Sequence, residues 1–432
     1  MPKIIAKSAL AALGIMLLAP GGTALAGKSD DTLRVAFYQP LQLIDAFHAA
    51  SPEASLVYRM VYDQMIRYDP VKRVYIPGLA ASWKQIDTLT MEFKLRQGVK
   101  WHDGKPLTMD DVEYTYGYMI NPKVRYRFKS TRTSWLDKFI RVDDQTFRLK
   151  SKRPNGVMLA NMVNFPSIYP KHIHGPIPLK DKASFGRNPI GTGPYKVVSV
   201  DPSKGVRLVR NDDYKHGNAG KPAGKIKNVF VRPIPSEQTQ IAQMMTGNID
   251  LMYNMDKEAA MQMAGNPSFK VAVQDSVSFS YMMFDSKGRS GNKSFTNPKV
   301  RRAFMHAVDR TALRSLVHPA IKRVLGNVCH PWVYGCNFSV KAPEYDPAKA
   351  KKMLKEAGFD FKQKLSILTW GEAKMTAEAV AGQLRQIGVK ASVNPATFGV
   401  FLRTRGKGVP LIVTLWDNSV GQPDIDNTAA YF

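Results

Sequence analysis

A strand signal, a tight turn and a capped helix follow one another between residues 91 and 119, and this run constrains the fold more than any other segment. Residues 91–95 alternate apolar and polar side chains, which predicts a half-buried strand. Asp103 and Gly104 supply turn residues, and Thr108 is placed to cap a helix that has carboxylates in its first turn. A chain that changes from a period of 2 to a period of 3.6 over so short a distance is predicted to be mixed α/β.

Further segments carry the same two signals in irregular alternation. Helices are predicted at residues 55–65, 297–310, 346–357 and 376–386, where apolar side chains recur at helical spacing. Strands are predicted at residues 33–37, 206–209, 229–231 and 411–415. No fixed repeat joins these segments, and 432 residues at about 100–200 per domain predict two to four domains.

The charge of the chain is strongly positive, with 62 Lys and Arg against 35 Asp and Glu. The basic residues are spread along the whole sequence and seldom exceed two in a row, as at Arg301-Arg302 and Lys351-Lys352. Nucleic-acid-binding proteins concentrate such residues in a stripe or tail. The pattern therefore favours a generally basic surface that attracts anionic membranes or acidic ligands, and no nucleic-acid partner is expected.

Residues 1–26 have the three parts of a secretory signal peptide: Lys3 and Lys7, an apolar run, and Ala24-Leu25-Ala26 as the cleavage site. No later stretch has the 18 apolar residues that a membrane span needs. We therefore expect an exported chain in an oxidising compartment. There Cys329 and Cys336 are predicted to form a disulfide, because a metal site would need two more close ligands that the sequence does not offer.

Motifs that carry catalysis are missing from the sequence. It contains no G-x-S-x-G, no H-E-x-x-H and no paired metal-ligand cassette. His102-Asp103-Gly104 is interpreted as a turn, and Gly191-Thr192-Gly193-Pro194 as a hinge or crossover loop. His172 and His174 lie on one face of a segment predicted to be extended, where a surface loop is favoured over a metal site. No enzyme activity and no cofactor are expected.

Several blocks together resemble one family, the extracellular solute-binding proteins of the peptide and nickel type that supply ABC importers. The most specific block runs from Ala81-Ser82-Trp83 through residues 93–112. Gly191-Thr192-Gly193-Pro194-Tyr195, Asn211-Asp212-Asp213-Tyr214 and Gly247-Asn248-Ile249-Asp250 resemble the blocks that follow, and residues 300–310 and 345–358 resemble two more. They occur in family order from about residue 33 to residue 423.

The resemblance implies the type II fold of periplasmic binding proteins, a bilobal α/β architecture with an extra domain that makes it three-lobed. It places lobe I at residues 27–70 and 188–275, the extra lobe II at 71–187, and lobe III at 276–432. After Pro423 the family continues with helices and a strand that return to lobe I. This sequence ends at Phe432, so lobe III is expected to be incomplete and the return segment to be missing.

The resemblance also implies a function and a set of ligand contacts. A periplasmic monomer would capture a short peptide or a peptide-like solute and deliver it to an inner-membrane ABC permease. The expected contacts are Trp416 and Phe398 lining the cleft, Arg405 holding a ligand carboxylate, and Tyr281 on an aromatic strand; plain core packing is the alternative for Phe398 and Trp416. 

The expected amine anchor departs from the family pattern. Peptide-binding members place an Asp three residues after the Trp, where this chain has Ser419. Asp417 could substitute for it, or the ligand lacks a free amine. A metal chelate, haem, a sugar or an antibiotic conjugate is therefore the alternative ligand, and an exported hydrolase or a nucleic-acid- or envelope-binding protein the alternative class.

Overall fold

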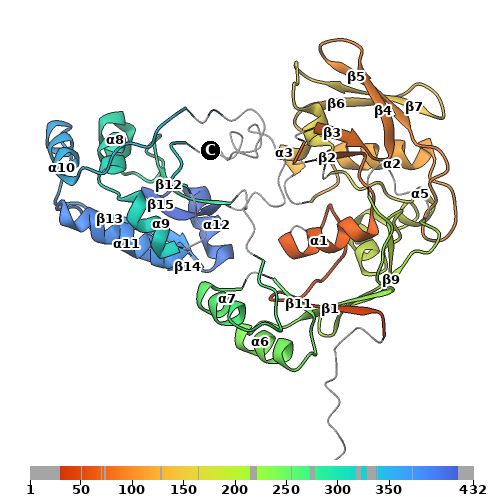
Figure 1. Ribbon diagram of the computed structural model, residues 1–432. Helices are drawn as coiled ribbons and strands as arrows, with labels where there is room; N and C mark the ends of the chain where they lie inside the picture. Colours follow the sequence, from red (N-terminus) through yellow and green to blue (C-terminus); the bar gives the residue numbers. More distant parts are fainter. Residues whose placement is uncertain are drawn as a thin grey trace, which may run out of the picture.

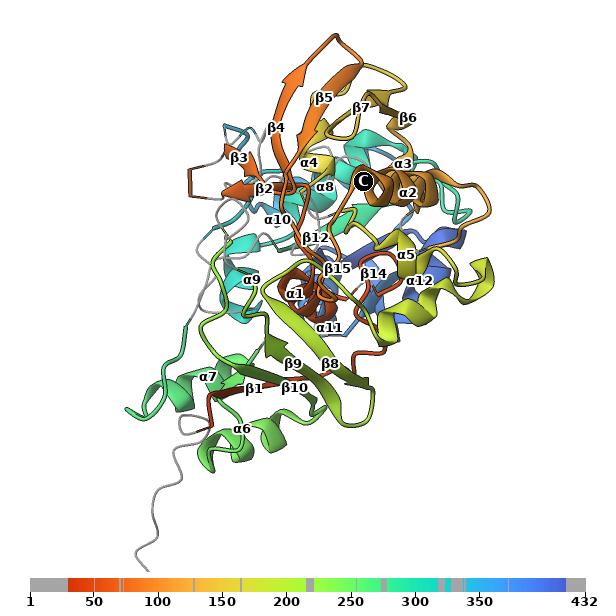
Figure 2. The same ribbon diagram turned by 90° about the vertical axis from the view of Figure 1, so that its right-hand side faces the viewer.

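The computed structural model describes residues 30–416, apart from residues 50, 70, 73, 127–128, 164, 215–220, 254, 273–277, 318–322, 328–336, 338 and 372. Three sheets of four or five strands organise this part of the chain. Figure 1 shows one of them at the lower right, one at the upper right and one on the left, and Figure 2 shows the same arrangement from the side. The fold is mixed α/β, as the sequence predicted.

The first sheet, here called the N-terminal sheet, has the strand order β11-β1-β10-β9-β8. Strand β1 lies between β11 and β10 and is parallel to both, and the predicted strands at residues 33–37, 206–209 and 229–231 all belong to this sheet. Its strands are β1 (Thr32–Phe37), β8 (Tyr195–Asp201), β9 (Gly205–Arg210), β10 (Asn228–Pro233) and β11 (Leu251–Met252). Helices α6 (Glu237–Met245) and α7 (Lys257–Ala264) lie beside it in Figure 1.

The second sheet, here called the inserted sheet, is antiparallel with the order β4-β5-β7-β6. Met91, Phe93 and Leu95 of β5 are buried, as the alternation predicted. Glu92 between them is also buried, because Lys84 and Arg148 pair with its carboxylate at 3.0 and 2.8 Å. The strands are β4 (Ala80–Gln85), β5 (Thr90–Leu95), β6 (Leu136–Arg141) and β7 (Thr146–Ser151), and a separate hairpin joins β2 (Ile66–Asp69) to β3 (Val74–Pro77).

The helices of this half begin where the sequence signals place them. In α2, the Asp111 carboxylate accepts a hydrogen bond of 3.0 Å from the Thr108 N–H, which completes the predicted cap. The prediction for α1 was wrong at its end: the helix stops at Val61, and Met65 is buried beyond it. These helices are α1 (Pro52–Val61), α2 (Met109–Ile120), α3 (Lys129–Thr133), α4 (Met158–Asn161), α5 (Lys171–His174) and the 3₁₀ helix η1 (Leu179–Arg187).

One continuous core joins the N-terminal sheet to the inserted sheet. It extends from Val35 to Val231 and takes side chains from both sheets and from α1 and α2. Phe47 is fully buried in it. The centroid of its ring lies 4.4–5.5 Å from the ring centroids of Tyr118, Tyr126 and Phe165. Burying large aromatic side chains supplies much of the stability of such a core.

The third sheet, here called the C-terminal sheet, has the order β12-β15-β13-β14 and a separate core between Phe295 and Val413. Its strands are β12 (Phe279–Phe284), β13 (Lys364–Trp370), β14 (Lys390–Ala396) and β15 (Leu411–Trp416). The helices are η3 (Ser294–Thr296), α8 (Pro298–His306), α9 (Arg310–Val317), α10 (Pro347–Glu356), α11 (Ala373–Gln386) and α12 (Phe398–Lys407). We call residues 278–416 the C-terminal unit.

The caps predicted for this unit are present, but one helix is shorter than expected. Asn297 and Asp346 accept hydrogen bonds from the first turns of α8 and α10, and Gly358 has a φ of +68° just after α10. The single helix predicted as far as Arg310 was wrong, because α8 ends at His306 and α9 begins at Arg310. Val308 is buried between the two helices, which is why its spacing resembled a continuing apolar stripe.

Two motifs that lie far apart in the sequence meet at a junction in the first core. His102 accepts a hydrogen bond from the Gly191 N–H at 3.2 Å through Nδ1, and its Nε2–H donates to the Gly193 carbonyl at 3.0 Å. The His102 N–H donates to the Gly191 carbonyl at 2.9 Å. The turn at residues 102–104 therefore holds the loop at residues 191–193, which fits the interpretation of the first segment as a turn.

The same loop packs directly on the end of α1. The Gly193 N–H donates to the Val61 carbonyl at 2.8 Å. A Cβ on Gly191 would lie 2.0 Å from the Val61 carbonyl oxygen, and one on Gly193 would lie 2.5 Å from the Met60 carbonyl oxygen. Only glycine allows the two backbones to approach this closely.

A buried carboxylate completes the junction. Asp63 is 3% exposed and accepts hydrogen bonds from the hydroxyls of Thr192 at 3.1 Å and Tyr214 at 3.0 Å. The Lys221 ammonium pairs with it at 3.2 Å. This ion pair ties the chain after residue 220 to the end of α1.

Candidate functional site

Polar and aromatic residues stand at, or soon after, the carboxyl ends of parallel strands in two sheets, and such ends are where open α/β sheets bind ligands. In the N-terminal sheet, β1, β10 and β11 are parallel. In the C-terminal sheet, β13, β14 and β15 are parallel. In Figure 1, α12, which follows β14, lies on the side of the C-terminal unit that faces the rest of the molecule, whereas α10 lies on the far side.

The carboxyl end of the N-terminal sheet carries a group of side chains that the sequence patterns did not reveal. Tyr38 follows β1, and its hydroxyl donates to the Glu237 carboxylate at 3.1 Å. The Asp256 N–H donates to the same carboxylate oxygen at 2.7 Å. Tyr253, which follows β11, packs its ring edge-on against Phe37 at 6.3 Å between centroids.

Partial burial and the neighbouring Asp256 raise the pKa of the Glu237 carboxyl. The Tyr38 and Glu237 side chains come together across 199 positions of sequence, so no local pattern could have paired them. The only available signal is their place just after a strand and at the start of a helix, and many residues share that signal. Carboxylate and hydroxyl groups at this edge can accept and donate hydrogen bonds to a polar ligand.

Among the predicted cleft residues that the structure describes, all but one fall at the carboxyl end of the C-terminal sheet. Trp416 is the last residue of β15 and is in register with Phe279 of β12, and Tyr281 is in register with Thr414. The rings of Phe279 and Tyr281 lie 6.1 Å apart. Phe398 opens α12 directly after β14.

Arg405 is the exception, because it lies in the last turn of α12. It lies seven positions after Phe398, a distance of about 10 Å along the helix axis. Helical side chains lean toward the helix N-terminus, so an arginine at this position is expected to extend in the direction of Phe398. Asp417, Ser419 and the cysteines at 329 and 336 lie outside the described residues, and so does the predicted signal segment at residues 1–26.

The two histidines weighed as a metal pair have different roles in the structure. His172 pairs with Asp103 at 2.7 Å, and His174 is fully buried with Nδ1 2.6 Å from the Tyr114 hydroxyl. They lie in the short helix α5, so the prediction of an extended segment was wrong. Across the described ranges, no group of three or more His, Cys, Asp or Glu side chains could hold a metal ion.

Desolvation lowers the pKa of His102, which is partly buried, and of His174, which is fully buried. Desolvation brings the pKa of His102 to about 4 and that of His174 to about 3, with the Lys182 ammonium adding to the effect at His174. Both rings are therefore neutral near pH 7 and serve as structural hydrogen-bonding groups.

None of the described helices is both long and apolar enough to cross a bilayer.

Comparison with known proteins gives a family match over most of the chain. The model of the bacterial extracellular solute-binding proteins, family 5, matches residues 74–431. Heme-binding protein A of Haemophilus influenzae is 26% identical over 395 residues, which are 85% of this chain and 70% of that protein. Oligopeptide-binding protein AppA of Bacillus subtilis is 29% identical over 326 residues, 73% of this chain and 57% of that protein.

The fold is also that of a solved relative. The structure of Bacillus subtilis AppA in complex with a nonapeptide superposes with a TM-score of 0.73 at 24% identity, covering 90% of this chain and 80% of that one. At this identity the likeness establishes the fold and leaves the ligand open. The chain spans 57–70% of the length of the two curated relatives.

Proposed function

Because the chain belongs to the bacterial extracellular solute-binding proteins of family 5, a family of non-enzymatic ABC transporter components, we propose that it is the periplasmic substrate-binding protein of an ABC importer. It captures a short peptide or a peptide-like solute and delivers it to an inner-membrane permease. The observation that carries this proposal is the family match. The polar and aromatic residues at the carboxyl ends of the N-terminal and C-terminal sheets support it.

The proposed mechanism is a population shift between open and closed forms. In the closed form, a ligand contacts the carboxyl ends of both the N-terminal and the C-terminal sheet. Because it makes both sets of contacts only in that form, it binds the closed form more tightly and favours closure. The separate core of the C-terminal unit supports such a motion, because a unit with its own core can move as a body. The three-lobed division at residues 70, 187 and 275 remains part of the proposal.

In this proposal, Trp416, Phe398 and Tyr281 line the ligand site from the C-terminal sheet. Tyr38 and Glu237 face the ligand from the N-terminal sheet. Peptide backbones are held by hydrogen bonds while hydrated pockets accept varied side chains. Asp417 takes the amine-anchoring role that Ser419 cannot fill, or the ligand has no free amine.

Native mass spectrometry of the protein purified from an exporting host tests the ligand class. We expect a retained mass that fragments as a short peptide. A retained haem or metal chelate would favour the second candidate, which the similarity to heme-binding protein A supports. A protein that neither retains nor binds any peptide or chelate by calorimetry would contradict solute capture.

Arg405→Ala is expected to weaken the binding of a ligand that has a free carboxylate by about 1.5–3 kcal/mol, because a charge-assisted hydrogen bond is lost. Calorimetry with that ligand and with its amide measures the effect. Arg403→Ala is the matched control, because Arg403 lies on the same helix and is exposed. Equal affinity of the wild type and Arg405→Ala for the carboxylate ligand would remove Arg405 from the site.

Cys329 and Cys336 are proposed to form a disulfide in the exported protein, after removal of residues 1–26. Thiol titration of denatured periplasmic material should then find no free sulfhydryl. Two free thiols per chain would contradict the pairing, and an N-terminus other than residue 27 would contradict the cleavage site.

A further inference from the structure

The excess of positive charge is concentrated in the C-terminal unit. Residues 278–416 contain 23 Lys and Arg against 8 Asp and Glu. The unit has about a third of the residues of the chain and more than half of its formal net charge of +27. The basic character is therefore a local property of this unit as well as a general one.

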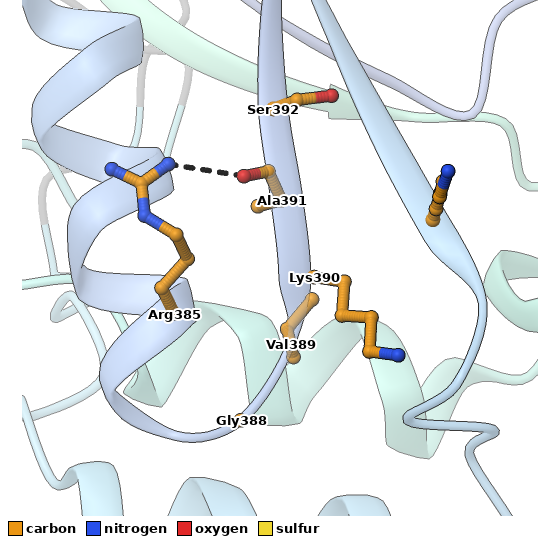
Figure 3. Close-up of a pocket in the computed structure, with 7 residues that line it drawn as sticks. Arg385, Gly388, Val389, Lys390, Ala391 and Ser392 are labelled. Atoms are coloured by element: carbon orange, nitrogen blue, oxygen red, sulfur yellow. Dashed lines mark hydrogen bonds between the residues drawn. The ribbon is translucent and has the colours of Figure 1, made fainter.

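Part of this charge gathers around a cavity at the amino end of the parallel strands. Lys364 and Lys390 are the first residues of β13 and β14 and stand in register with each other. With Arg385, Ser392 and the backbone at residues 388–391 they line a cavity of ≈ 450 Å³ (Figure 3). The seven lining residues include three cations and no Asp or Glu.

The guanidinium of Arg385 is oriented by the strand beside it. Its Nη1 donates to the Ala391 carbonyl at 3.0 Å, the contact drawn as a dashed line in Figure 3. This single bond leaves other N–H groups of the guanidinium available, since arginine has five such donors. Lys364 and Lys390 are exposed, so their ammonium groups are hydrated and can move toward an anion.

More lysines extend the basic surface beyond the cavity. Lys355 lies in the last turn of α10, and Lys362 lies in the loop that leads into β13; both are exposed. The acidic neighbour Asp360 caps the Lys362 N–H at 2.8 Å. We call Lys355, Lys362, Lys364, Arg385 and Lys390 the basic end. It lies at the amino ends of β13 and β14, opposite the carboxyl ends that carry the candidate ligand site.

We propose that the cavity binds the phosphate group of an anionic phospholipid and that the basic end rests on the membrane surface when it does. Lysine and arginine near an anionic bilayer are attracted by its surface potential, and the attraction falls off within a Debye length. Because the basic end points away from the candidate ligand site, the C-terminal unit can lie on the bilayer without covering that site. The proposal does not depend on which solute the protein carries.

Two observations favour a lipid surface over other anions. The charges continue outside the cavity onto α10 and the following loop, which suits an extended surface better than a single small ion. The cavity lining contains no aromatic side chain, whereas sites for single-stranded nucleic acids stack bases on aromatic rings. Charge complementarity with an anionic bilayer therefore accounts for both the cavity and its surroundings.

Cosedimentation of the full chain with vesicles tests the proposal. We expect binding to phosphatidylcholine vesicles that contain phosphatidylglycerol, no binding to pure phosphatidylcholine, and a steep loss of binding with added salt. The double variant Lys364→Glu/Lys390→Glu should bind at least about tenfold more weakly. Lys123→Glu/Lys138→Glu is the matched control, because it changes the net charge equally at exposed lysines near the inserted sheet and should lose less than about threefold.

The outcomes separate the alternatives. Equal losses in the two double variants would show that overall charge alone drives binding and would overturn the site. Binding of inorganic phosphate that the Lys364/Lys390 variant abolishes, with vesicle binding unchanged, would make this a free-phosphate site instead. Tighter binding to single-stranded DNA than to the anionic vesicles would also overturn the proposal. Lys364→Gln/Lys390→Gln, with melting followed by circular dichroism, replaces the charge-reversed variant if that one does not fold.

Discussion

Gly191→Ala is expected to lower the free energy of unfolding by about 4 kcal/mol or more. Losses of this size are exceptional, and here the cause is the disruption of a tightly packed backbone contact. The new Cβ would lie 2.0 Å from the Val61 carbonyl oxygen and 2.7 Å from the carbon of that group. Both atoms belong to the backbone at the end of α1, so no side-chain rotation can relieve the clash. The loop must move, and it loses its hydrogen bonds to His102 when it does.

Urea unfolding followed by circular dichroism measures this loss. Gly117→Ala is the matched control: Gly117 lies inside α2, and nothing lies within 4 Å of its added Cβ. That substitution should raise stability by about 0.4–1 kcal/mol, because alanine restricts the unfolded chain. Unfolding of Gly191→Ala at the wild-type urea concentration would disprove the close approach of this loop to α1.

Acidification from pH 7.5 to pH 5 is expected to cost about 4 kcal/mol of stability through two histidines, about 2 kcal/mol each. Their folded pKa values of about 4 for His102 and about 3 for His174 lie below the ordinary value of 6.5. Between these values the unfolded chain binds protons that the folded chain does not, so stability falls as the pH falls. The stabilising effect is fully present above pH 6.5 and disappears progressively below it.

Desolvation is the largest cause for both rings, and the neighbours of each ring oppose a proton in a different way. A proton on Nδ1 of His102 would break the bond from the Gly191 N–H. A proton on His174 would place a cation in a fully buried site beside the Lys182 ammonium, which bonds to the same Tyr114 hydroxyl at 2.9 Å.

Chemical denaturation at a series of pH values checks this expectation. His174→Phe retains ring packing against Tyr169, whose centroid lies 4.0 Å away, but it cannot titrate. This variant should lose about half of the slope of stability against pH between pH 6.5 and pH 5, while its stability at pH 7.5 also reflects the lost hydrogen bond. A slope identical to that of the wild type would mean that His174 does not contribute.

Local structure was predictable from the sequence at several caps, although the helices that Ser236 and Asp256 cap were not predicted. Thr108, Asn297 and Asp346 each begin a helix where their short polar side chains predict one. The errors occurred where burial continues beyond a helix, as at Met65 and Val308, because apolar spacing alone cannot distinguish a helix from a buried loop that follows it. His174 was misjudged for a related reason: its complete burial depends on aromatic residues distant in sequence, such as Tyr118.

The candidate site was predictable only in part. Trp416 and Phe398 were predicted as ligand contacts from the family resemblance, and both positions fall at the carboxyl end of the C-terminal sheet. Tyr38 and Glu237 were missed because their contact depends on the pairing of β1 with β10, which no local pattern contains. The junction of His102 with the loop at residues 191–193 was missed for the same reason.

The position of β1 between β10 and β11 in the N-terminal sheet also affects the order in which this chain can fold. Thr32 pairs with Asn228 of β10, and Val35 pairs with Leu251 of β11. Strand β1 therefore cannot form its ladder until partners about 200 residues later in the sequence have been synthesised. Contacts this distant in sequence make folding slow, because the loop must close before they can form. The N-terminal sheet therefore cannot be completed before the chain has been made as far as Met252, whereas the inserted sheet pairs strands that all lie within residues 80–151.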